Sequence, residues 1–195
     1  WLMPRMQSLV ALLPGWKIST INTEGGNRIA ADEANLMIRI GNGDWPNQQA
    51  ILLFEEEVFP VCSTEFMHKH GLTNQAVEPG ELNQLPLIYE DLGGREWMNW
   101  REWFSCFDVK YNFPDDARPL FNYALVLQAA MEGKGLALAW QQLAEPYLTN
   151  GWLVEIPDMR VKTGQGYYLC FSRGNPVGEV IQQWCQSLDG NFAYE

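Results

Sequence analysis

The sequence lacks an excess of basic residues, and this restricts the partners it can have. Its 195 residues include 13 Lys and Arg against 24 Asp and Glu, which gives a net charge of −11 at pH 7. Nucleic-acid-binding surfaces are usually basic, because neutralising phosphates supplies much of their affinity. We therefore expect no direct contact with DNA or RNA from this segment, and interpret the acidic balance as a solvated surface that favours solubility.

Paired cysteine motifs and long apolar runs are also missing. No CxxC pair occurs among the four cysteines, which are Cys62, Cys106, Cys170 and Cys185. Such spacing argues against zinc sites and disulfide frameworks, and favours free thiols in a reducing compartment. No stretch approaches the ~20 apolar residues of a membrane helix, and no signal peptide is visible. We expect a cytoplasmic protein with no cofactor, no metal and no membrane partner.

Catalytic motifs are scarce. Gly164-Gln165-Gly166 lacks the third glycine and the following helix of a dinucleotide-binding turn. Cys62 with His68 or His70 could form a cysteine–histidine nucleophile, but both histidines flank a lysine in a predicted exposed helix end. We interpret the acidic run 55–57 as a solvated strand edge rather than a metal site. The sequence therefore predicts a protein that is not an enzyme.

The sequence does contain enough apolar residues, 47%, for one substantial core or two small ones. Predicted helices and short apolar strands alternate along it, which indicates an α/β domain and favours a mostly parallel sheet. An aromatic stripe at 97–104 could stack on bases, but without a basic surround we expect it in the core. The expected strands are 17–22, 36–40, 57–62, 87–89, 136–139, 152–156 and 166–172, and the longer expected helices are 2–13, 122–132, 141–148 and 177–188.

The most informative stretch lies between Asp32 and Phe66. A buried strand at 36–40 stops at the glycine-rich turn 41–44, and the strand at 57–62 leads into Ser63-Thr64-Glu65, which is typical of a helix N-cap. Strands that end in this way build ligand crevices in α/β domains.

Two segments of that stretch, D.ANLMIRIGNGDWP and E.VFPVCSTEF, resemble the effector-binding domain of LysR-type transcriptional regulators, in the glycine-cleavage-activator branch. Residues 1–5 are similar to the helix after the first strand of that family. Residues 121–139 are similar to its second-subdomain helix and the strand that follows. The resemblance covers nearly the whole chain.

The resemblance implies an α/β fold of the two-lobed periplasmic-binding-protein-like type (type 2), with two Rossmann-like subdomains joined by two crossing strands. Crossings near 61–62 and 164–168 give subdomain I as residues 1–61 plus 168–195 and subdomain II as residues 62–167. The family's winged helix-turn-helix DNA-binding domain, and its first strand with a hydroxyl-rich turn, are expected before Trp1 and are absent from this chain.

In the family a small effector binds between the lobes, so the resemblance implies ligand-binding residues at strand and helix ends. These are Thr23, Gly41, Asn42, Cys62, Ser63, Asn122, Tyr123 and Tyr167. Many relatives have Asp-Ser or Asp-x in place of Asn122-Tyr123, which changes the charge of the pocket. This polar and aromatic set favours an amino acid or other zwitterion over a dicarboxylate.

Structural interpretations of the same residues remain open. Ser63 and Asn122 are also good N-caps, and Tyr167 could be a buried structural tyrosine, with Tyr168 facing the opposite way. Arg39 could pair with a ligand carboxylate, or with Asp32 or Glu33 at the strand end.

We therefore expect the ligand-sensing and oligomerisation domain of a LysR-type regulator, in which a small-molecule effector shifts the lobes allosterically and so modulates transcription. The family's pairing implies a homodimer or homotetramer through helix 2–13 and helix 123–132 of a partner, with DNA bound only through the missing N-terminal domain. The facing residues would be Met6, Leu9 and Val10 with Leu127, Ala130 and Met131. One alternative is a periplasmic solute-binding protein of a transporter, which should avoid free thiols; another is a hydrolase using Cys62.

Overall fold

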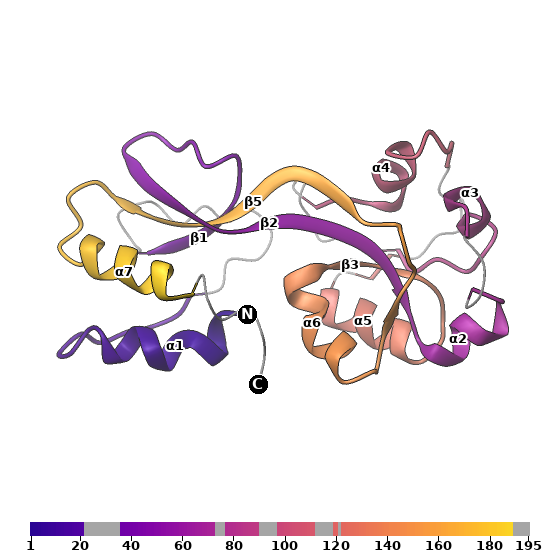
Figure 1. Cartoon of the computed structure of the whole chain (residues 1–195), viewed down its shortest axis with the longest axis horizontal. Helices are drawn as coiled ribbons and strands as arrows, with labels where there is room; N and C mark the ends of the chain where they lie inside the picture. The colour runs from indigo at the N-terminus through magenta and orange to yellow at the C-terminus, as the bar shows by residue number, and fades with distance from the viewer. Residues whose placement is uncertain (22–35, 73–76, 90–96, 112–118, 121, 189–195) are drawn as a thin grey trace. The chain divides into compact units, whose positions relative to one another are not determined.

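The chain forms two compact units in the computed structural model (Figure 1). The structure describes residues 1–21, 36–72, 77–89, 97–111, 119–120 and 122–188. Unit 1 comprises Trp1–Glu55 and Gly164–Glu195, and unit 2 comprises Glu56–Thr163. The chain therefore passes between the units twice, each time within a strand.

These two crossing strands, β2 (Gln48–Cys62) and β5 (Val161–Ser172), are longer than the sequence predicts. Each begins several residues before its expected start. The chain passes from one unit to the other after Glu55 and after Thr163.

The five-stranded sheet has the order β1-β5-β2-β3, with β4 also paired to β2. Its shorter strands are β1 (Met37–Gly41), β3 (Ala137–Trp140) and β4 (Val154–Glu155). The registers that β1 makes with β5, and that β3 and β4 make with β2, are antiparallel. A parallel bridge joins Leu87 and Leu136.

The predicted mostly parallel sheet is therefore wrong for the described strands. Alternating helices and strands suggest parallel crossovers, but β5 returns the chain to unit 1 and there runs opposite to β1. The expected strand at 17–22 is also not observed, since residues 17–21 have no strand structure and Asn22 lies outside the described residues.

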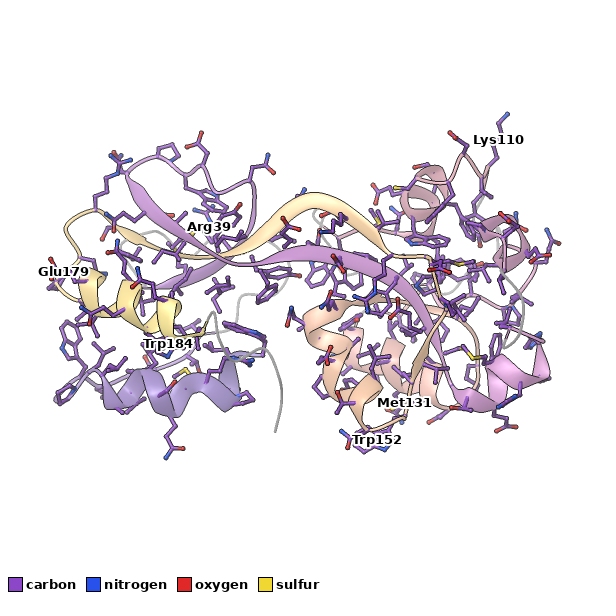
Figure 2. All side chains as sticks on the ribbon, in the orientation of Figure 1. Arg39, Lys110, Met131, Trp152, Glu179 and Trp184 are labelled. Atoms are coloured by element: carbon purple, nitrogen blue, oxygen red, sulfur yellow. The ribbon has the colours of Figure 1, made fainter. Side chains whose placement is uncertain are left out.

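In the described residues, the core of unit 1 lies between two helices and the sheet. Helix α1 (Leu2–Ala11) packs beside α7 (Gly178–Leu188). Trp184, which lies between them in Figure 2, is buried and donates a hydrogen bond from Nε1 to Ser8 Oγ, 2.9 Å away. This bond satisfies the indole N–H inside an otherwise apolar cluster.

Unit 2 contains the remaining helices and two apolar clusters. The helices are α2 (Thr64–Lys69), α3 (Pro79–Leu82), α4 (Trp100–Ser105), α5 (Tyr123–Met131) and α6 (Gln141–Thr149). Strand β2 serves both clusters by alternation: Val58 and Cys62 face one, and Phe59 and Val61 face the other. Trp100, Trp103 and Phe104 of the aromatic stripe are buried in the first cluster, which confirms their predicted core role.

Within the described residues, no helix has both the length and the hydropathy that a bilayer crossing requires.

Candidate functional site

A carboxyl group lies inside unit 2 where β2 enters it. Glu56 is 3% exposed. Its Oε1 accepts a hydrogen bond from Trp140 Nε1 at 2.8 Å, and its Oε2 accepts one from Thr163 Oγ1 at 2.6 Å. The predicted solvated edge at 55–57 is therefore wrong for Glu56. Alternation along β2 turns Glu56 inward, whereas Glu55 is exposed and Glu57 pairs with Arg160.

The environment of Glu56 favours its neutral form. Burial raises the pKa of this carboxyl above its ordinary value, while the hydrogen bonds from Thr163 and Trp140 act in the opposite direction. A buried carboxylate is costly unless it is well hydrogen-bonded. The two donors therefore decide how stable the charged group is in this position.

Trp140 also connects Glu56 to the start of α5. Its backbone N–H donates to Tyr123 Oη at 3.2 Å, and the two rings meet edge to face with centroids 5.4 Å apart. The ring of Trp97 lies 4.7 Å from that of Trp140 and 6.3 Å from that of Tyr123. We call Glu56, Trp97, Tyr123, Trp140 and Thr163 the junction cluster; all five belong to unit 2.

The junction cluster lies at the end of unit 2 where the chain enters and leaves. Glu56 and Thr163 are the first and last residues of the unit. Tyr123 follows Asn122, which caps α5 by accepting a hydrogen bond from the Ala124 N–H to Oδ1 at 2.9 Å. Hydrogen bonds through Trp140 thus connect Tyr123, one of the expected ligand-binding residues, to Glu56 and Thr163 at the chain crossings, and Asn122 immediately precedes Tyr123.

Cys62 and Ser63 lie at the other end of α5. Ser63 Oγ accepts the Phe66 N–H at 3.2 Å as the N-cap of α2, and a Cβ added to Gly133 would lie 3.3 Å from this oxygen. Gly133 comes just after α5, whose nine residues span about 13 Å. Ser63 is therefore a structural cap, one helix length away from Asn122.

The chemistry of Cys62 also argues against a nucleophile. Its side chain is buried, and burial raises the pKa of the thiol to about 12 despite a backbone hydrogen bond involving Met67. A reactive cysteine needs a lowered pKa and access to solvent. In the described part of the chain, moreover, no group of His, Cys, Asp and Glu side chains is arranged to hold a metal ion.

The expected ligand-binding residues of unit 1 that the structure describes are Gly41, Asn42 and Tyr167. Gly41 has φ +148°, and a Cβ there would lie 3.0 Å from the Trp45 ring, so a side chain would be both strained and crowded. Asn42 is exposed in the turn that follows. Thr23 lies outside the described residues.

The two tyrosines of β5 use opposite faces of the strand, as alternation predicts. The ring of Tyr167 packs against Phe54 with centroids 4.8 Å apart. The ring of Tyr168 meets Trp45 edge to face at 5.5 Å, and it lies within 2.7 Å of where a Cβ on Gly43 would be.

Arg39 lies on β1 (Figure 2), where its register partner on β5 is Tyr168. Its Nη1 donates to Gln48 Oε1 at 3.1 Å, and its guanidinium lies 4.7 Å from the centroid of the Trp45 ring. The proposed acid partners, Asp32 and Glu33, lie outside the described residues. The described contacts already hold the arginine against β2 and the turn that precedes it.

Comparison with known proteins agrees with this fold. Residues 1–193 match the family described as the LysR substrate binding domain. The chain is 26% identical over 194 residues to the HTH-type transcriptional activator AmpR of Rhodobacter capsulatus, covering 99% of this chain and 63% of that protein. It is 27% identical over 188 residues to the glycine cleavage system transcriptional activator of Escherichia coli K12, covering 94% and 59%.

Solved structures show the same architecture. The effector domain of the transcriptional regulator AmpR of Pseudomonas aeruginosa aligns with a TM-score of 0.71 at 22% identity, covering 99% of this chain and 93% of that one. Full-length AphB of Vibrio cholerae, a virulence activator, aligns with a TM-score of 0.68 at 16% identity, covering 98% and 63%. The predicted two-lobed periplasmic-binding-protein-like fold is thereby confirmed.

The chain spans about three fifths of the length of these curated relatives. Its match to the family covers nearly all of its own residues and includes both units. The chain belongs to the LysR substrate binding domain family.

Proposed function

We propose that this chain is the effector-sensing domain of a LysR-type transcriptional regulator. The observation that carries the proposal is the family match over residues 1–193, on a fold whose two units are joined by two strands. A small metabolite that binds one arrangement of the units better than another would shift their populations. A DNA-binding segment of the whole protein would then respond; this acidic domain would not contact DNA itself.

We place the effector contacts of unit 2 at the start of α5. Tyr123 belongs to the junction cluster and Asn122 immediately precedes it, and a helix N-terminus favours anionic groups such as a carboxylate. From unit 1 the proposed contacts are Thr23, Gly41, Asn42 and Tyr167. The proposal excludes Cys62 and Ser63, which lie at the other end of α5. Together these polar and aromatic groups suit an amino acid or another zwitterion.

A thermal-shift screen with amino acids, small carboxylates and aromatic acids tests the proposal. A ligand that binds only the folded state raises the melting temperature. We expect a hit whose shift is reduced by Asn122→Ala and by Tyr167→Phe. Asn99→Ala is the matched control, because Asn99 also caps a helix of unit 2 but belongs to α4.

Two results would count against the proposal. A hit that neither variant reduces would place the ligand elsewhere. If neither this domain nor the full-length protein responded to any compound in the panel, the proposal that it senses these classes of metabolite would be wrong.

We further propose that α1 and α5 form the contact between protomers, with a revised set of residues. Leu9, Leu127 and Ala130 are buried within their own units, so they are not available to a partner as first expected. Exposed apolar side chains on the same helices are Met3 at 72% and Val10 at 45% on α1, and Leu125 at 51% on α5. These residues are the proposed interface.

The relatives are named as transcriptional regulators, which does not favour a transporter's solute-binding protein or a hydrolase. The cysteines do not favour these functions either. None of the four cysteines is in a disulfide, and Cys106 is exposed, which suits a reducing cytoplasm better than the periplasm of a transport protein. The upstream gene sequence distinguishes the two: a helix-turn-helix pattern supports the regulator, and a secretory signal supports the solute-binding protein.

A further inference from the structure

The hydrogen bonds of the junction cluster form a continuous path. It begins at Tyr123, whose hydroxyl oxygen accepts the Trp140 backbone N–H at 3.2 Å. The indole N–H of the same tryptophan donates to Glu56 Oε1 at 2.8 Å. Thr163 then donates to Glu56 Oε2 at 2.6 Å. The path thus runs from the start of α5 to one residue on each crossing strand.

The hydrogen-bond path includes one residue from each of the two strands that connect the units. Glu56 on β2 and Thr163 on β5 are separated by 107 residues in sequence, and their hydrogen bond adds a side-chain link between two strands that are neighbours in the sheet. They are also the residues at which the chain enters and leaves unit 2. A cross-link here fixes the two connections to each other and, through Trp140, to the body of the unit.

The residues just beyond this cross-link differ in character. Gly164 follows Thr163 with φ +80°, a conformation that glycine adopts easily, and an added Cβ there would have nothing within 4 Å. Glu55, which precedes Glu56, is exposed. Hinges are a few residues that absorb changes in φ and ψ, and they are often small, so an uncrowded glycine next to a restrained residue suits this role.

We propose that Glu56 is a positioning residue. It holds β2 and β5 in place where they meet unit 2, so that the units move relative to each other about the strand segments on the unit 1 side of Glu56 and Thr163. The contact to Tyr123 makes this arrangement responsive to a ligand at the start of α5. This second part rests on the proposed function, whereas the first part does not depend on any ligand.

Neutral replacements distinguish this role from simple packing. Glu56→Leu removes both acceptors. Glu56→Gln keeps the path, because its amide oxygen can accept from Trp140 while its NH₂ donates to the Thr163 hydroxyl oxygen. Leu82→Ala is the matched control for lost stability, since Leu82 is fully buried in the same apolar cluster as Trp140 but lies on α3, outside both crossing strands.

Spin-label distance measurement provides the readout. Cys106 is exposed in unit 2, and Gln182→Cys on α7 adds an exposed label site in unit 1; the other natural cysteines are buried. Diluting labelled protein with an excess of unlabelled protein removes distances between protomers. In the wild type the distances between the two labels define a reference range. We expect Glu56→Leu to change the ratio of molecules outside this range to molecules inside it by roughly twofold to thirtyfold. Glu56→Gln and Leu82→Ala should match the wild type.

The proposal is overturned if Glu56→Leu leaves the distribution unchanged, or if Leu82→Ala broadens it equally. Should Glu56→Leu fail to fold, Thr163→Val decides, because it removes one donor at nearly constant volume; an unchanged distribution would then overturn the proposal. No effector is needed for this measurement. A broadened distribution without any thermal-shift hit would therefore support the hinge role while the sensing function failed.

Discussion

At the scale of single residues, Glu56 makes the stability of the protein depend on pH. Its folded-state pKa is raised by burial, so the folded protein binds this proton more tightly than the unfolded chain does. The contribution of Glu56 to the free energy of unfolding is therefore greatest below the unfolded pKa. It is lost as the pH rises through the raised, folded-state pKa.

The variant Glu56→Gln should remove this dependence, because glutamine resembles the protonated carboxyl at every pH. We expect its free energy of unfolding, relative to that of the wild type, to increase as pH rises from below the ordinary glutamate range towards neutrality. Urea unfolding of both proteins at a series of pH values measures the difference. Parallel curves for the two proteins would show that Glu56 is not the group responsible.

Thiol reactivity should separate the cysteines in the native protein. Burial raises the pKa of Cys62 to about 12 and that of Cys170 to about 11, and Cys185 is also buried. The thiolate is the reactive form, so these three should react with iodoacetamide at neutral pH far more slowly than the exposed Cys106. Mass spectrometry of alkylated peptides gives the rates. Denatured protein, in which all four should react alike, is the control.

Equal labelling of Cys62 and Cys106 in the native state would contradict the burial of Cys62. It would also restore the cysteine–histidine nucleophile, which otherwise lacks an accessible thiolate.

The position of Glu56 could not be foreseen from the residues around it. Three consecutive glutamates suggest a solvated edge, and the sequence signal for a strand starts only at Glu57. Once β2 is known to begin at Gln48, alternation turns Glu56 inward together with Val58. Hydrogen bonds from Trp140 and Thr163, which are distant in sequence, offset the free-energy cost of burying this carboxyl. No local pattern encodes those partners.

At the scale of elements, the cap of α5 allows stability and ligand binding to be tested separately. Asn122 accepts the Ala124 N–H, so Asn122→Ala should lower the free energy of unfolding by about 1 kcal/mol. Asn122→Asp keeps a capping oxygen and should cost less than that. If an effector carboxylate binds at this helix start, the negative charge of the aspartate should nevertheless weaken binding of the effector.

Chemical denaturation and thermal-shift titration of both variants provide the two readouts. An aspartate variant that is stable and binds the effector normally would show that Asn122 is only a cap.

Helix starts and strand directions differ in how far sequence determines them. Ser63 and Asn122 cap their helices as predicted, because a capping side chain bonds to a backbone N–H within the next three residues. The antiparallel pairing of β1 with β5 joins segments more than a hundred residues apart. Composition and periodicity carry no information about that direction, so alternating elements were insufficient to determine the sheet.

At the scale of the whole molecule, the exposed apolar residues of α1 and α5 give a testable assembly. If α1 of one protomer packs on α5 of the other, a two-fold axis repeats the contact, and each single change acts twice. Met3→Lys or Leu125→Glu should therefore weaken self-association by at least about tenfold, or about 1.4 kcal/mol. Sedimentation velocity across a concentration series measures this directly.

Combining the two changes distinguishes pairing of α1 with α5 from pairing of each helix with its own copy. In the proposed pairing, the lysine that Met3→Lys introduces on one protomer would approach the glutamate that Leu125→Glu introduces on the other. The double variant should therefore associate more strongly than either single variant. If instead each helix packed on its own copy, the double variant would carry like charges at both contacts and associate more weakly. Gln182→Lys, a change at an exposed polar position of α7 outside the proposed interface, controls for net charge alone. Recovery in the double variant thus requires the α1–α5 contact, since no other pairing of these two helices brings the opposite charges together.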